Sequence, residues 1–284
     1  MPELPEVETV KNGLEAAIAG ERILKVHVYR RDLRIPIPPN FSAQIEGNVA
    51  TGFRRRAKYI LMELSNKKTV IMHLGMSGTF RIAQKKNENC VAQKHDHVRF
   101  DLANGICIFY HDPRRFGCMD ITDTNNADSH KSLFFLGAEP LTKEFNAAFL
   151  MKKFEKKNLA IKQAIMDQHV VVGVGNIYAS EALYMARISP LLSSKDLDKD
   201  SATRLVDAIK KVLKKAIEKG GSTLRDYRQV SGDIGDFQSR FSVYDRTGER
   251  CPHCVCDIAR TGGIRRVVQG GRSSFYCPVI QESQ

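Results

Sequence analysis

The hydrophobic pattern of the chain changes about 130 residues from its start. Up to about Gly20, apolar residues recur at helical spacing, and two prolines stand in the first turn, where no amide donor is missed. Short apolar or alternating runs follow, separated by Gly, Asn and Pro. They predict strands at 23–29, 45–53, 59–64, 69–74, 98–102 and 106–111. An N-terminal helix followed by a β-sandwich or barrel is therefore expected.

After about Asp128 the pattern is helical. The spacing predicts helices at 145–154, 158–168, 176–186 and 203–219. The last helix has one apolar face and ends at Gly220-Gly221. Its other face carries four lysines, which we interpret as solvated surface: Lys210, Lys211, Lys214 and Lys215. Two short β-like runs, 264–268 and 273–276, complete the chain.

Composition adds a partner to this picture. The 284 residues suggest two domains with a small appendage, and 44 Lys+Arg against 32 Asp+Glu leave a net charge of +12. This surplus favours a polyanion, with nucleic acid preferred over a membrane surface; the alternative is a merely basic protein. No apolar run is long enough to span a bilayer, and the first residues do not resemble a signal peptide. We expect a soluble cytoplasmic protein.

Cysteines gather near the end of the chain, at Cys251, Cys254, Cys256 and Cys277. Because intracellular thiols stay reduced, this cluster indicates metal binding before disulfides. A structural zinc site needs four ligands, usually from two CxxC knuckles, but Ile280 occupies the expected fourth position and cannot ligate. Cys256 or His253 could complete the site. The alternative is a finger without metal, held by packing alone.

Two other patterns are weak when taken alone. Gly173-Val-Gly175 precedes a predicted helix that Asn176 is expected to cap, an arrangement that suits a phosphate but is usually a plain turn. Once Met1 is removed, Pro2 presents an α-amine beside Glu3. Such an amine has a pKa of about 8, below that of lysine, and can attack an electrophilic carbon such as a sugar C1′. Pro and Glu are also ordinary in a first helical turn.

Taken together, several motifs are more specific. They are Pro2-Glu-Leu-Pro-Glu-Val-Glu-Thr9, His73-Leu-Gly-Met-Ser-Gly78, Asp112-Pro-Arg-Arg-Phe-Gly117, the stretch 166–181 and Gly271-Arg-Ser-Ser-Phe-Tyr-Cys-Pro278. In order and spacing the chain resembles the formamidopyrimidine-DNA glycosylase family over essentially its whole length. The Glu3-Leu4 start is similar to the oxidised-purine branch, since the endonuclease VIII branch typically has Gly after that Glu.

The resemblance implies an α+β multidomain protein that binds DNA in a cleft. Residues 1–130 would form a catalytic domain of N-terminal helix and β-sandwich, and 131–230 a helix-two-turn-helix domain. Residues 231–284 would hold the remainder of a lesion-binding loop (225–238) and a C-terminal β-hairpin zinc finger. The protein is expected to act as a monomer, without a membrane, on double-stranded DNA that contains an oxidised purine or an abasic site.

The resemblance also implies roles for single residues. Pro2 would be the nucleophile, Glu3 its proton donor with Glu6 in support, Lys58 the lysine of β-elimination, and Arg272 the finger arginine that grips phosphates and assists δ-elimination. Met76, Arg114 and Phe116 would fill the void left by a flipped base, although the first and last could otherwise be core residues. The remaining DNA contacts would be His95, Lys157, Lys162 and Asn176, mostly to phosphate.

These observations predict a bifunctional glycosylase and abasic-site lyase for 8-oxoguanine and formamidopyrimidines. They also predict one zinc ion per chain, bound by Cys251, Cys254, Cys277 and, in place of the missing ligand, Cys256. An oxidised-pyrimidine glycosylase of endonuclease VIII type and a non-catalytic damage binder are the rival interpretations.

Overall fold

The computed structural model describes residues 1–84, 90–222, 235–255 and 257–281. The chain forms two compact units. The first comprises Met1–Phe135 with Ile217–Gln238, and the second comprises Leu136–Ala216 with Ser239–Gln284. These units are defined by compactness alone. The three-part division at residues 130 and 230 therefore stays a prediction.

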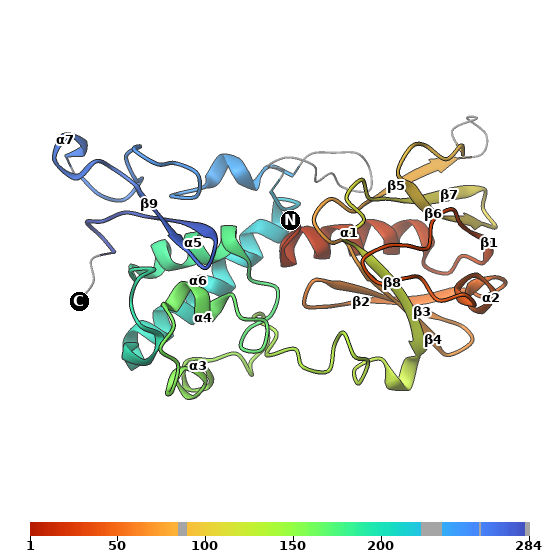
Figure 1. Ribbon diagram of the computed structural model, residues 1–284, viewed down its shortest axis with the longest axis horizontal. Helices are drawn as coiled ribbons and strands as arrows, with labels where there is room; N and C mark the ends of the chain where they lie inside the picture. The colour runs from red at the N-terminus through yellow and green to blue at the C-terminus, as the bar shows by residue number, and fades with distance from the viewer. Residues whose placement is uncertain (85–89, 223–234, 256, 282–284) are drawn as a thin grey trace. The chain divides into compact units, whose positions relative to one another are not determined.

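The first unit is a β-sandwich with a helix at its start (Figure 1). Helix α1 (Leu4–Ile18) packs against β2 and β3. One antiparallel sheet has the order β1 (Ile23–Val28), β6 (Asp96–Leu102), β7 (Ile106–His111) and β5 (Thr79–Gln84). The other has the order β2 (Ala50–Arg56), β3 (Tyr59–Leu64), β4 (Lys68–His73) and β8 (Cys118–Asp123). The short helices α2 (Phe41–Ile45) and η2 (Thr124–Asn126) complete the unit.

Alternation along the strands explains the sandwich. In β6, Val98, Phe100 and Leu102 enter a core that also receives Ile60 and Met62 of the facing sheet. Successive strand residues point to opposite faces, so one apolar residue in two is enough to build each inner face. The core continues under α1 through its apolar stripe at Val7, Val10, Leu14 and Ile18. The predicted helix and sandwich are therefore confirmed.

Some strand boundaries were predicted wrongly. The run 45–53 is not one strand, because Phe41 and Ile45 form the buried face of α2 and β2 begins only at Ala50. Strands β5 and β8 were missed. Each is only partly buried and mixes polar with apolar residues, so its periodicity is weak without the neighbouring strands.

The second unit is mainly helical. Its helices are α3 (Ala147–Phe154), α4 (Ile161–Ile165), α5 (Asn176–Ala186), η3 (Ser194–Asp196), α6 (Lys199–Glu218, ending in the first unit) and α7 (Ile258–Thr261). The short helix η4 (Phe237–Arg240) spans the other boundary between the units. A hairpin of β9 (Arg265–Gln269) and β10 (Arg272–Tyr276) packs against α5. None of the helices in the described ranges combines the length and apolarity that a membrane crossing requires.

Candidate functional site

Two buried glutamates organise the start of the first unit. Glu3 is the N-cap of α1, and its side chain accepts a hydrogen bond from the backbone of Glu6 in a capping box. In return, Glu6 Oε2 accepts from the Glu3 amide at 2.8 Å. Glu6 Oε1 accepts from the amide and the hydroxyl of Ser222, at 2.7 and 3.0 Å. Glu6 thereby ties Ser222 to the turn that follows Pro2, while Met1 is exposed.

Lys58 lies in the short turn between β2 and β3. Its neighbour Ala57 has a φ of 53°, which an L-residue adopts only when its surroundings require it. Arg55 holds the hairpin to α1, because its guanidinium donates to Glu8 at 2.8 Å and to the Ala57 carbonyl at 2.8 Å. Lys58 is itself buried. Lysine is mostly exposed in folded proteins, so the burial of Lys58 is informative.

His73 is a half-buried side chain at the end of β4 to which no role was assigned from the sequence. Burial, together with the positive charges of Lys58 and Arg34, lowers the pKa of His73 to about 4. Its Nδ1 accepts a hydrogen bond from the Gly75 amide at 2.9 Å, so the ring proton resides on Nε2. The motif His73–Gly78 contains this histidine, but its neutral state can be recognised only from the surroundings that the fold gives it.

The motifs 73–78 and 112–117 place apolar side chains on the surface. Met76 is 39% and Phe116 43% exposed, so neither is a core residue. The guanidinium of Arg114 lies 4.8 Å from the centre of the Phe116 ring, a cation–π distance. His95 is half-buried, has a φ of 73°, and accepts a hydrogen bond from the Asp112 amide through its carbonyl. The structure thus gathers four predicted DNA contacts on adjoining turns.

In the second unit, Lys162 is an internal connector. Its side chain is 1% exposed, and Nζ donates to Asn176 Oδ1 at 2.6 Å, to the Ser273 carbonyl at 2.8 Å and to Ser274 Oγ at 2.8 Å. Asn176 also donates to the Ser273 carbonyl, at 3.0 Å. The expectation that Asn176 caps α5 was wrong, because the N-cap is Gly175 and the amide of Asn176 is turned to the hairpin. Both residues join α4, α5 and β10.

Beside this connector lies a cavity of about 210 Å³. It is lined by Lys162, Gln163, Met166, Asp167, Gln269, Gly270 and Arg272. The hairpin turn approaches α4 so closely that a Cβ on Gly270 would lie 2.8 Å from the Gln163 amide nitrogen. Lys157 pairs with Asp167 at the same place, and this pairing contributes to a lowered pKa of Asp167. The exposed Arg272 and the cavity offer cationic groups to an anion.

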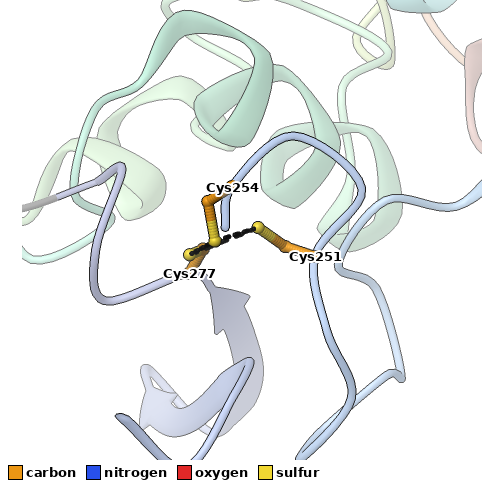
Figure 2. Close-up of side chains that lie close together, drawn as sticks. All are labelled: Cys251, Cys254 and Cys277. Carbon is orange, nitrogen blue, oxygen red and sulfur yellow. Dashed lines mark hydrogen bonds between the residues drawn. The ribbon is translucent and has the colours of Figure 1, made fainter. Parts of the chain in front are cut away.

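Three thiols meet where the hairpin ends (Figure 2). The sulfur atoms of Cys251, Cys254 and Cys277 lie 3.0, 3.4 and 3.6 Å apart in pairs. Tetrahedral zinc, with Zn–S bonds of about 2.3 Å, holds its sulfur ligands about 3.7 Å apart, so the donor set fits zinc. His253 is not part of the group, since its ring stacks on Tyr184. Cys256 lies outside the described residues.

A disulfide joins Cys90 to Cys107. No pairing was predicted for these cysteines, and reduced thiols were expected, so the disulfide differs from the expectation. Cys107 points to the outer face of β7, opposite the main core, where it packs with Ala83 and Phe109. Arg99 donates to the Cys90 carbonyl at 3.0 Å and holds that segment beside the strand.

Two family models match the chain. Residues 1–119 match the formamidopyrimidine-DNA glycosylase N-terminal domain, and residues 136–228 match the H2TH domain of the same family. Among curated proteins, formamidopyrimidine-DNA glycosylase of Rhodospirillum rubrum is 46% identical and aligns over 98% of both chains. That of Roseobacter denitrificans is 45% identical, over 99% of this chain and all of its own.

Solved structures agree. The MutM (Fpg) protein of Thermus thermophilus superposes with a TM-score of 0.86 at 35% identity, covering both chains completely. Lactococcus lactis Fpg in complex with DNA containing an abasic site gives a TM-score of 0.88 at 32% identity, over 99% of this chain and all of the other. The chain belongs to the formamidopyrimidine-DNA glycosylase family.

Proposed function

We propose that this protein is a bifunctional DNA glycosylase and abasic-site lyase that removes oxidised purines during base excision repair. The observation that carries the proposal is the identity of about 45% over nearly the full length with relatives named formamidopyrimidine-DNA glycosylase. The solved neighbours include Lactococcus lactis Fpg bound to DNA with an abasic site and with N7-benzyl-Fapy-dG. We assign the same class of DNA to this chain.

The reaction begins at Pro2. After removal of Met1, the lone pair of the Pro2 amine forms a bond to C1′ of the damaged nucleotide, and the bond from C1′ to the base breaks. The Pro2 nitrogen loses its N–H proton as this bond forms, and the departing base takes up one proton in exchange. Glu3, buried next to Pro2, then delivers a proton to the ring oxygen O4′ as the sugar opens to the Schiff base. Glu6 fixes the Glu3 backbone through its hydrogen bond at 2.8 Å.

Two eliminations follow. A proton passes from C2′ to water as the C3′–O bond breaks and the 3′ phosphate leaves. A second elimination expels the 5′ phosphate in the same way, which leaves a gap of one nucleotide. We assign Lys58 to the first step, because a partly desolvated ammonium stabilises the charge of a departing phosphate. We assign Arg272 to the phosphates that flank the lesion. Its position at the edge of a cavity with Lys162 supports this role.

Such an enzyme must turn its target base out of the stack. We propose that Met76 and Phe116 enter the space left behind and that Arg114 pairs with the orphaned base; the exposure of both apolar side chains supports this. His95, Lys157 and Asn176 would contact phosphates. Lys162 would act there only indirectly, by holding Asn176 and β10, because its ammonium already has three acceptors. The lesion-binding loop falls largely outside the described residues.

One zinc ion would stabilise the hairpin that carries Arg272. Cys251, Cys254 and Cys277 would be its ligands, and we propose Cys256 as the fourth. When bound, the ion supplies a structural crosslink between the knuckle and the end of β10. We further propose that the protein works as a monomer in the cytoplasm, associated with the nucleoid.

The nucleophile is tested by borohydride trapping on an 8-oxoguanine duplex. We expect a covalent complex when Pro2 is the first residue, and none when an uncleaved N-terminal tag keeps its nitrogen in an amide. The two samples differ only in tag removal, so the fold is matched. Glu3→Gln should lower excision by about 10²–10⁴-fold, the usual range for loss of a general acid. Efficient trapping with the tag in place would falsify the Pro2 assignment.

Substrate choice separates the rival glycosylase. Excision of 8-oxoguanine should exceed excision of thymine glycol when the two are compared opposite the same base. The reverse order would support an enzyme of endonuclease VIII type. Tight binding to both duplexes without any trapping would support a non-catalytic binder.

A further inference from the structure

Three turns of the first unit meet at Asp112, two of them through its carboxylate and one through its backbone. The side chain of Asp112 is fully buried. Its Oδ1 accepts from Ser77 Oγ at 2.6 Å, and its Oδ2 accepts from the Gly117 amide at 2.8 Å and the Tyr110 hydroxyl at 3.1 Å. Hydrogen bonds to a charged acceptor are stronger than neutral ones, and more so away from water. Asp112 therefore fixes its partners firmly.

The backbone of Asp112 joins the third turn. Its amide donates to the His95 carbonyl at 3.0 Å, and its carbonyl is 2.8 Å from His97 Nε2. Ser77 Oγ, besides donating to the carboxylate, accepts from the Arg114 amide at 3.3 Å. One residue thus connects the turn that carries Met76, the turn that carries His95 and the turn that carries Arg114 and Phe116.

The turns also touch through their backbones. A Cβ on Gly75 would lie 2.3 Å from the backbone of Phe116, and a Cβ on Gly117 would lie 1.7 Å from the Tyr110 hydroxyl. Real Cβ atoms do not approach other atoms so closely, so both positions require glycine. The turn that carries Met76 therefore packs directly against the backbone of Phe116, and we expect a displacement of either turn to press on the other.

We propose that Asp112, acting through Ser77, is a positioning residue for base extrusion. It holds Met76, Arg114 and Phe116 in one arrangement, so that they enter the DNA as a unit. The inference rests on the proposed function, because it assigns these three side chains to the void. Asp112 touches neither the damaged base nor the sugar in this scheme. Its effect should appear only where a base pair must be opened.

The decisive variant is Ser77→Ala. Asp112→Ala would leave buried donors without acceptors and would confound positioning with folding. Ser77→Ala removes little volume and takes away the hydroxyl that joins the turn of Met76 to the turn of Arg114. On duplex DNA with 8-oxoguanine, we expect single-turnover excision to fall about tenfold, the effect of losing one hydrogen bond to a charged group. Fluorescence of 2-aminopurine next to the lesion, which reports unstacking, should fall in parallel.

A single-stranded oligonucleotide with an abasic site supplies the reference. Its sugar needs no extrusion, so borohydride trapping on it reports the Pro2 chemistry alone. Ser77→Ala should trap this substrate as fast as the wild type. Thr69→Val is the matched control, because it removes a buried hydroxyl hydrogen bond (2.9 Å to Thr124) from the same sandwich at a distance from the turns. It should leave both assays unchanged.

The outcomes distinguish the positioning role of Asp112 from the proposed glycosylase function. A loss on duplex DNA alone supports positioning. Equal losses on both substrates would indicate a general structural role, and no loss on either would show that the link is dispensable; each result overturns the inference. Failure of the wild type to trap either substrate would instead overturn the proposed function, and the inference with it.

Discussion

The two units stabilise the side chains that we assign to DNA in different ways. In the first unit, the turns with Met76, Arg114 and Phe116 rest on a large sandwich core and on the buried Asp112 carboxylate. In the second, the hairpin with Arg272 rests on a small cluster in which two of the six buried residues are cysteines. Where the hydrophobic core is large, internal hydrogen bonds are enough to hold the DNA-contacting turns in place. A small module needs a further crosslink.

Metal removal should have the largest effect, and it should destabilise the second unit while leaving the first unit folded. We expect a chelator, or Cys277→Ser, to unfold the β9–β10 hairpin, because structural zinc contributes on the order of 10 kcal/mol to such modules. Loss of Arg272 and its surroundings should then weaken DNA binding by about 100-fold or more. Amide exchange in β9 and β10, measured together with zinc content, tests this directly.

The sandwich serves as the internal control for that experiment. Its amides should keep their protection after chelation, since the described part of the first unit contains no cysteine cluster. If the zinc-free protein retained a protected hairpin and full affinity, the finger would be held by packing alone.

The contact between the turns can be broken by one methyl group. Gly75→Ala places a Cβ 2.3 Å from the Phe116 backbone at a φ of 63°, so either the turns separate or the backbone strains. We expect a loss of about 3 kcal/mol or more in the free energy of unfolding. Gly20→Ala is the matched control, with a φ of 80° but nothing within 4 Å, and should cost only about 1 kcal/mol. Denaturant unfolding compares the two, and equal costs would mean that the turns adapt freely.

The parts of this picture that the sequence predicts are those with a local signal. Helical spacing gave α1 and α6, and alternation gave most of the sandwich. Spacing could not give Asp112 as a meeting point, because its partners Ser77 and His95 are distant in the chain and only strand pairing brings them close. The Cys90–Cys107 bond was missed for the same reason.

Burial changed the interpretation of two lysines. Lysine is mostly exposed in folded proteins, yet Lys58 and Lys162 are both buried. The ammonium of Lys162 donates three hydrogen bonds to acceptors in α5 and β10, which lie far along the chain. Met76 and Phe116 show the opposite case: their apolar character alone would have placed them in the core, but both are exposed.

Acid should weaken the first unit through His73. Its folded pKa of about 4 lies below the unfolded value of 6.5, so the unfolded chain takes up the proton first. The stabilising contribution is complete above pH 6.5 and is lost as the pH falls towards 4, by at most about 3 kcal/mol. We expect His73→Asn to remove this part of the pH dependence in urea unfolding. The exposed His169→Asn should keep it, and an unchanged profile in His73→Asn would contradict the assignment.

The smallest expected effect is on the salt dependence of DNA binding. It distinguishes the charge of Arg272, which we assign to a phosphate contact, from charges elsewhere on the surface. Arg272→Ala should lower affinity about tenfold and reduce the slope of log K against log salt by about 0.9, because one phosphate contact is lost. Replacing Lys211, Lys214 and Lys215 by alanine removes three charges, yet it should leave the slope nearly unchanged, since these exposed residues follow the solvated face of α6. Fluorescence anisotropy at several salt concentrations measures both. If the triple variant lost more slope than Arg272→Ala, the lysine face would also contact DNA, and binding would not depend on the hairpin and turns alone.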